Sequence, residues 1–174
     1  GSHAYLEIIA INSIATPAID SGARRWFDMD NLELRGVVAR NGPQLTHWVA
    51  RVSDISTSMA ALATLGIDRG TARQASRQTP NGLLQWQISV RTDGQRLFDG
   101  CLPTLIQWGD THPTDAMPDS GVSLHNLLIQ HPQADALRQA LDTACLSNFP
   151  VTHGPALLSA FFFNDTAPTE IYTL

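Results

Sequence analysis

The side chains best suited to chemistry are a carboxylate and an imidazole, each in the middle of a short apolar segment. Glu7 lies within Ala4–Ile11 and His47 within Leu45–Val52, and the pattern predicts a strand for both segments. A carboxylate and an imidazole are typical ligands of Fe(II), Mn(II), Ni(II) or Zn(II). The pair predicts a metal site if a third ligand meets them. The alternative is that His47 is a hydrogen-bonded core residue, since buried polar groups normally find ordinary partners.

Three further side chains could contact a small-molecule substrate. Arg77 precedes the turn residues 80–82, and an arginine at the mouth of a cleft could hold a substrate carboxylate or carbonyl pair through two hydrogen bonds. The alternative is a solvent-facing arginine beside an ordinary turn. Trp86 and Trp108 lie in segments predicted to be adjacent strands. They could form the walls of an aromatic pocket, or they could simply pack the sheet.

Other reactive side chains are not assigned to a site. Asp110 and His112 are flanked by glycine and proline, which favours a turn. Cys101 has no general base at a meaningful spacing. Catalytic residues therefore stay unassigned.

The elements that must position these residues follow from the apolar periodicity. Residues 84–90 alternate between apolar and polar side chains, which predicts a strand with one buried face. Residues 54–65 predict a helix, because apolar residues recur there at helical spacing: Ile55, Met59, Leu62 and Leu65. Ser53 or Asp54 is placed to cap this helix, and Gly66 to end it.

A second strand-helix unit follows later in the chain. Residues 123–130 predict a strand, and Leu137 and Leu141 predict the apolar face of a helix. Shifted by 78 positions, this unit overlays the earlier one, with His125 on His47. The chain therefore contains a weak internal repeat of a strand-helix unit.

Composition limits the classes of partner. The chain has 174 residues, enough for one domain with a core, and its formal net charge of −5 argues against nucleic acid or an anionic membrane as a partner. The two cysteines have no zinc-knuckle spacing, and no apolar run is long enough to span a membrane. We expect a cytoplasmic protein that acts on a small molecule.

The predicted strands, together with the stretch from Ser76 to Trp86, resemble the glyoxalase-like branch of the vicinal oxygen chelate superfamily over residues 1–145. The resemblance implies an α+β fold. In it, βαβββ modules form a curled mixed sheet around a cleft, and the first module is incomplete here.

The resemblance also implies a ligand set. In this superfamily each module supplies a histidine from its first strand and a carboxylate from its last. His47 and Glu7 match such positions, and Gln107 stands near the second carboxylate position. A neutral amide is a poorer ligand than a carboxylate, because it brings no charge to offset dehydration of the ion. The first-module histidine would lie on a missing strand, so we expect weak metal binding or none from this chain alone.

The implied activity is Lewis-acid activation of a small substrate through adjacent oxygens, as in isomerases, lyases and ring-cleaving dioxygenases. The competing hypothesis is a metal-free module that binds or sequesters a small molecule in the same cleft. Family precedent allows a homodimer for the complete protein.

The two ends of the chain suggest a fragment. We expect residues 1–158 to form a glyoxalase-like domain without its first strand, helix and strand. Residues 159–174 are expected to be a non-native or disordered tail. Residues 161–174 contain no arginine, have no periodicity and resemble a translated sequencing adapter. The alternative is a natural edge strand with a disordered terminus.

Overall fold

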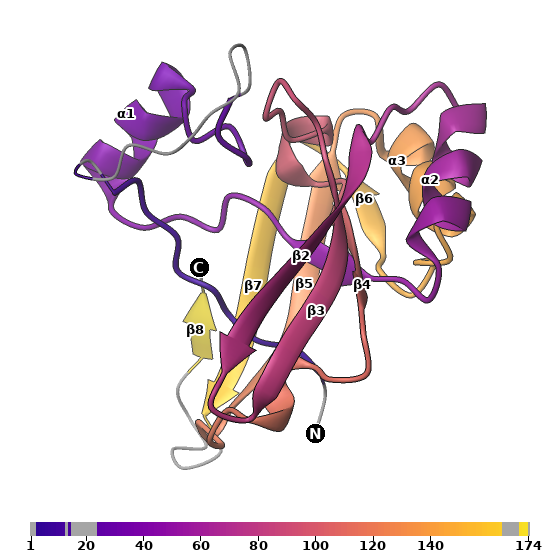
Figure 1. The fold of residues 1–174 in the computed structure, drawn as a ribbon. Coiled ribbons are helices and arrows are strands. Elements are labelled where there is room, and N and C mark those ends of the chain that lie inside the picture. The colour runs from indigo at the N-terminus through magenta and orange to yellow at the C-terminus, as the bar shows by residue number, and fades with distance from the viewer. Residues whose placement is uncertain (1–2, 13, 15–23, 165–170, 174) are drawn as a thin grey trace.

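The computed structural model describes residues 3–12, 14, 24–164 and 171–173 (Figure 1). The helices are α1 (Leu32–Asn41), α2 (Ile55–Thr64) and α3 (Ala134–Thr143). The strands are β1 (Val49–Arg51), β2 (Thr71–Thr79), β3 (Gly82–Val90), β4 (Thr104–Trp108), β5 (Val122–His131), β6 (Val151–His153), β7 (Leu157–Asn164) and β8 (Ile171–Thr173). Two short 3₁₀ helices cover Phe98–Gly100 and Pro113–Asp115. None of the described helices has the length and apolarity needed to cross a membrane.

The first sheet has the strand order β1-β4-β3-β2. Strand β1 runs parallel to β4, and the other two pairings are antiparallel. In chain order this is one strand, a helix and three strands, which is the expected βαβββ module. The mixed α+β fold predicted from the sequence is confirmed.

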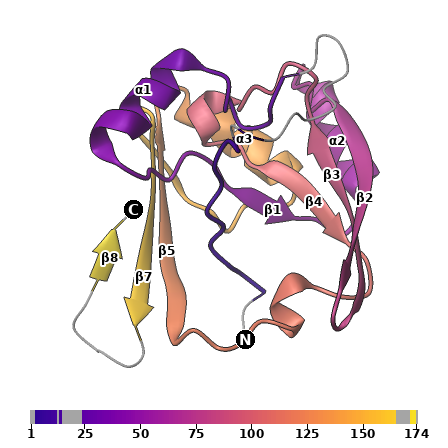
Figure 2. The same ribbon diagram turned by 60° about the vertical axis from the view of Figure 1, so that its left-hand side comes forward.

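The second sheet has the order β6-β5-β7-β8 and begins with a similar strand-helix unit, β5 followed by α3. Its pairing differs from the first sheet. Strand β5 lies parallel to β6, the strand directly after the helix, whereas β1 lies parallel to β4. Figure 2 presents the two sheets on opposite sides of the view, with the N-terminal segment running between them.

The predicted strand-helix repeat is present, but its offset is 79 positions rather than 78. The buried strand residues Ala50 and Ile129 are 79 positions apart, and so are the buried helix residues Ile55 and Ala134. Val49, which the 78-residue offset places on Leu127, is exposed. Because side chains alternate along a strand, an offset wrong by one residue exchanges the two faces.

Helix α2 packs on the core as its periodicity predicts. Ile55 and Leu62 are fully buried, and Met59 and Leu65 pack against the same cluster. The Asp54 side chain accepts hydrogen bonds from the backbone N–H groups of residues 56 and 57. Gly66 follows the helix with φ of 73°, a conformation that favours glycine.

Two strand predictions for the N-terminal half are wrong or too long. Residues 4–11 form no strand, and Ile8 is 88% exposed, because no sheet edge pairs with this segment. The segment at 45–52 contains only the three-residue strand β1, and His47 lies just before it. Strand β2 was not predicted, since its mostly polar sequence lacks the alternation that signals a half-buried strand.

The C-terminal segment contributes to the second sheet. Strand β7 pairs with β5 over most of its length. Ala160 is buried, and Phe162 packs against the core cluster. Residues 165–170 and 174 lie outside the described residues, and the foreign origin of residues 159–174 stays a prediction.

Leu62 gives the most direct test of how α2 packs. Because its side chain is 0% exposed, Leu62→Ala should leave a cavity and lower the free energy of unfolding by about 2–5 kcal/mol. Ser56→Ala, on the exposed side of the same helix, should change it by less than about 0.5 kcal/mol. Urea unfolding of both variants measures this. Equal effects would show that α2 is packed differently.

Candidate functional site

The β1–β4 sheet has a second apolar face, turned away from α2. On β4, Leu105 belongs to the core cluster with α2, and Gln107 reaches the start of α2, whereas Ile106 belongs to a separate cluster. Side-chain alternation and strand register place a common set of residues on this other face. We call it the aromatic face, and its members are Val49, Arg51, Thr71, Arg73, Ala75, Arg77, Leu84, Trp86, Ile88, Val90, Thr104, Ile106 and Trp108.

The centre of the aromatic face is a tryptophan pair. Trp86 lies directly opposite Trp108 in the register of β3 and β4, and the ring centroids are 5.5 Å apart. Both rings are half-buried and pack against Ile88, Val90 and Ile106. The prediction that the two tryptophans lie on adjacent strands is confirmed. Their position leaves part of each ring free to contact a ligand.

A histidine after β4 extends this aromatic surface. The His112 ring meets the edge of Trp108 at 5.2 Å and stacks on His3 at 4.7 Å. Arg51 Nη1 donates to His3 Nδ1 at 3.2 Å, and the Tyr5 ring lies 6.0 Å from His112. Burial, followed by the neighbouring His3, lowers the pKa of His112. Residues 3–5 therefore lie over this end of the face.

The other end of the face is polar and centred on Thr104. His47 Nδ1–H donates to the Gly100 carbonyl at 3.1 Å, and its Nε2 accepts from the Thr104 N–H at 3.1 Å. Arg69 Nη2 donates to Thr104 Oγ1 at 3.1 Å. Desolvation and the nearby Arg69 lower the pKa of His47 to about 3. His47 is therefore neutral, and both of its ring nitrogens are engaged.

The three predicted metal ligands do not come together. Gln107 Oε1 accepts the Ile55 N–H at 2.9 Å and so completes the start of α2 on the opposite face of the sheet. Glu7 lies exposed on the N-terminal segment. No hydrogen bond or ion pair joins any two of Glu7, His47 and Gln107, and the part of the chain that the structure describes holds no group of three or more acidic, histidine or cysteine side chains that could bind a metal. These residues, as arranged, do not fit a divalent ion.

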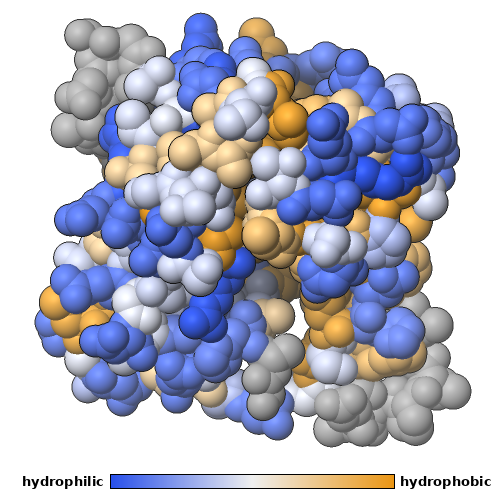
Figure 3. All heavy atoms as spheres, turned by 90° about the vertical axis from the view of Figure 1, so that its right-hand side faces the viewer, coloured by the Kyte–Doolittle hydropathy of each residue, from blue (hydrophilic) through white to orange (hydrophobic). Residues whose placement is uncertain are grey.

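Three arginines lie on the same sheet face as the tryptophan pair. The register of β1 and β2 puts Arg51, Arg73 and the predicted substrate residue Arg77 on the aromatic face. The four strands of this sheet contain no Asp or Glu. In Figure 3 the lower half of the surface is hollowed between the side that carries β2 and β3 and the side that carries β5 and β7. Residues of apolar type lie mainly along the right-hand wall and the top of this hollow, whereas the left-hand wall is mostly hydrophilic.

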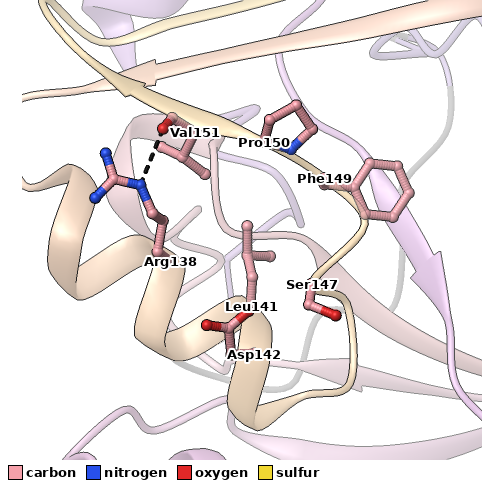
Figure 4. Close-up of a pocket in the computed structure, with 7 residues that line it drawn as sticks. All are labelled: Arg138, Leu141, Asp142, Ser147, Phe149, Pro150 and Val151. Atoms are coloured by element: carbon pink, nitrogen blue, oxygen red, sulfur yellow. Dashed lines mark hydrogen bonds between the residues drawn. The ribbon is translucent and has the colours of Figure 1, made fainter.

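A separate cavity of about 210 Å³ lies between α3 and the segment before β6 (Figure 4). Its wall includes Leu141, Phe149 and Arg138, whose Nε donates to the Val151 carbonyl at 3.0 Å. None of the residues predicted for a site lines it. It is smaller than the roughly 300 Å³ at which ligand pockets usually begin, and we assign it no role.

Sequence reasoning missed three residues on or next to this face. His112 was expected only in a turn; it does cap the 3₁₀ helix at Pro113, but its ring also joins the aromatic surface. Arg51 and Arg69 carried no signal, because their importance depends on which strands pair. Cys101 is buried with its thiol near the carbonyls of residues 130 and 157, and burial raises its pKa, so it does not act as a nucleophile.

Comparison with known families gives one match. The model of a family described as a glyoxalase-like domain matches residues 1–145. Neither the comparison with curated proteins nor that with solved structures gives a match.

The neutral state of His47 predicts acid sensitivity. The unfolded chain binds a proton near the ordinary pKa of 6.5, whereas the folded chain does so only near 3. The stability that neutral His47 gives to the folded state is therefore complete above pH 6.5, and it is lost as the pH falls toward 3. Between pH 7.5 and 5.0 the free energy of unfolding should drop by about 2 kcal/mol. His47→Gln should have a lower free energy of unfolding at pH 7.5 than the wild type. On acidification to pH 5.0, its free energy of unfolding should fall by less than that of the wild type. Urea unfolding at both pH values measures this, and His153→Gln, an exposed control, should keep the wild-type drop.

Gln107 should contribute to stability through α2. Gln107→Ala removes the acceptor for the Ile55 N–H and should lower the free energy of unfolding by about 1 kcal/mol. Gln87→Ala is the matched control, because Gln87 is the register partner on β3 and makes no side-chain hydrogen bond among the described residues. If Gln107→Ala lowered the free energy of unfolding, measured with denaturant, no more than Gln87→Ala does, the capping role would be wrong.

Proposed function

Because the chain belongs to the glyoxalase-like domain family of the vicinal oxygen chelate superfamily, we propose that it binds a small planar anion on the aromatic face without a metal ion. Binding or sequestration, rather than catalysis, is the function that the arrangement of side chains supports best.

The observation that carries this proposal is the half-buried pair of Trp86 and Trp108 on a sheet face bordered by arginines. Aromatic rings offer a large, rigid contact surface for another flat molecule. Guanidinium groups add attraction through their charge and through paired hydrogen bonds to carboxylates. The sheet strands carry no acidic residue, so every charge that they place on this face is positive, although the whole chain has a net charge of −5. Glu7, which acts electrostatically on Tyr5, is an opposing charge nearby.

The N-terminal segment limits access to this surface. The rings of His3 and Tyr5 lie beside His112 at the edge of the tryptophan pair. Burial is the first cause of the raised pKa of Tyr5, and Arg77 opposes it, so Tyr5 also lies within electrostatic range of β2. A ligand on Trp108 would contact this segment or displace it.

A metal-dependent isomerase, lyase or dioxygenase is the second candidate, and family membership is what favours it. A bound Fe, Mn, Ni or Zn ion would supply Lewis-acid activation of two vicinal substrate oxygens. The surroundings of His47 and Gln107 do not fit such an ion. We therefore assign no catalytic step to Glu7, His47 or Gln107. A homodimer remains a further proposal from the family.

Fluorescence titration with anilinonaphthalene sulfonate, a flat aromatic anion, tests the proposal. Trp108→Leu should weaken binding about tenfold through loss of stacking, and Arg77→Gln should weaken it less and mainly at low salt. Leu32→Ala is the control, because Leu32 is an exposed apolar residue on α1, outside the aromatic face. Treatment with EDTA should leave the dissociation constant unchanged.

Two results would overturn metal-free binding at this face. One is equal affinity of the Trp108→Leu and wild-type proteins for the dye. The other is loss of dye binding in EDTA with recovery on adding Zn(II), Mn(II), Ni(II) or Fe(II), which would favour the metal-dependent candidate.

A further inference from the structure

Arg69 is a buried charge with no acidic partner. Only 4% of the residue is exposed. Its one side-chain hydrogen bond runs from Nη2 to Thr104 Oγ1 at 3.1 Å, and its buried Nε has no partner. No carboxylate forms an ion pair with Arg69 among the described residues. A guanidinium in this state has unused donors and an uncompensated charge.

Leaving such a group unpaired is costly. Moving a charge out of water costs several kcal/mol unless a counter-ion or hydrogen bonds replace the lost hydration. Deprotonation does not resolve this at neutral pH: burial and the nearby Arg91 lower the pKa of Arg69 only to about 10. Proteins therefore rarely keep a buried arginine unless something binds to it.

Arg69 is one of the residues that line a small cavity. The volume of this cavity is about 10 Å³, roughly the space that one water-sized group occupies. Trp26, Phe27, Ser89 and Thr104 line it as well. Arg91 also borders it, but its charge is already met by Asp93 at 2.5 Å. None of the described residues that line the cavity is acidic.

The backbone holds Arg69 in a fixed position. A Cβ at Gly70, whose φ is 76°, would lie 2.1 Å from the Val90 carbonyl oxygen, so the chain passes tightly against the end of β3 here. On the other side Thr104 is held by His47. Donors held in place before a ligand arrives lose little entropy on binding.

We propose that Arg69 binds the carboxylate of a small organic acid through its Nε–H and Nη–H groups, in the cavity beside Trp26 and Phe27. One oxygen fills the present space, and the rest of the ligand extends past Trp26, which is 38% exposed. This site is independent of the proposed function at the tryptophan pair. Val90 and Trp86 are four residues apart on β3, about 13 Å along the strand.

Thermal unfolding with formate as the probe tests the site. Sodium formate replaces sodium chloride at constant ionic strength. The melting temperature of the wild-type protein should rise by about 4 °C, saturating once formate exceeds its Kd about tenfold. Arg69→Met should abolish the rise, and the variant without formate should melt at or above the wild-type temperature, because an unpaired buried charge has been replaced by an apolar chain. Arg35→Gln, on the exposed side of α1 and outside both proposed sites, should respond to formate as the wild type does.

A second measurement tests the site even if the Arg69→Met variant does not fold. In wild-type protein with ¹⁵N-labelled arginine, the Nε–H resonance of Arg69, assigned through its own side-chain carbons, should shift saturably with formate. No shift, no rise in melting temperature, or an equal rise in Arg69→Met would overturn the site. Dye binding by Arg69→Met separates the two proposals, since this variant should retain wild-type affinity if both are correct.

Discussion

The register of β4 is the constraint on which the rest of the structure depends. This strand is hydrogen-bonded on both edges, to β1 in parallel and to β3 in antiparallel orientation. Its side chains therefore serve two separate apolar clusters: Leu105 faces the helices, whereas Ile106 and Trp108 form the aromatic face. A shift of one residue would place Gln107 among the tryptophans and Trp108 against α2. The core and the candidate site thus exclude a register shifted by one residue.

Positive charge without matching negative charge distinguishes the aromatic face. Arg51, Arg73 and Arg77 border it, and Arg69 lies buried near its polar end. Four arginines outside this face form ion pairs with carboxylates, as Arg96 does with Asp28 at 3.1 Å. Among the described residues, Arg51, Arg69, Arg73 and Arg77 form no such pair. Anionic ligands are the chemistry that such a surface selects.

Two of the predicted metal ligands have structural partners that explain their presence. His47 joins the loop before β1 to the backbone at Gly100 and Thr104. Gln107 completes the first turn of α2. A polar side chain on an apolar strand suits a metal ligand and a local hydrogen-bonding residue equally well. The two roles differ only in which groups lie opposite the polar side chain in the folded protein. The sequence does not say which groups those are.

Local patterns in the sequence determined the elements that carry a clear apolar periodicity or helix cap. Helices α2 and α3 and strands β3 and β5 formed where apolar periodicity, the Asp54 cap and Gly66 predicted them. The sequence also placed Trp86 and Trp108 on neighbouring strands. Tertiary structure alone decided that residues 4–11 pair with no sheet edge, that polar β2 forms a strand, and that Arg69 is buried without an acid. Each of these depends on contacts between segments far apart in the chain, and periodicity within one segment cannot encode which distant segment it will meet.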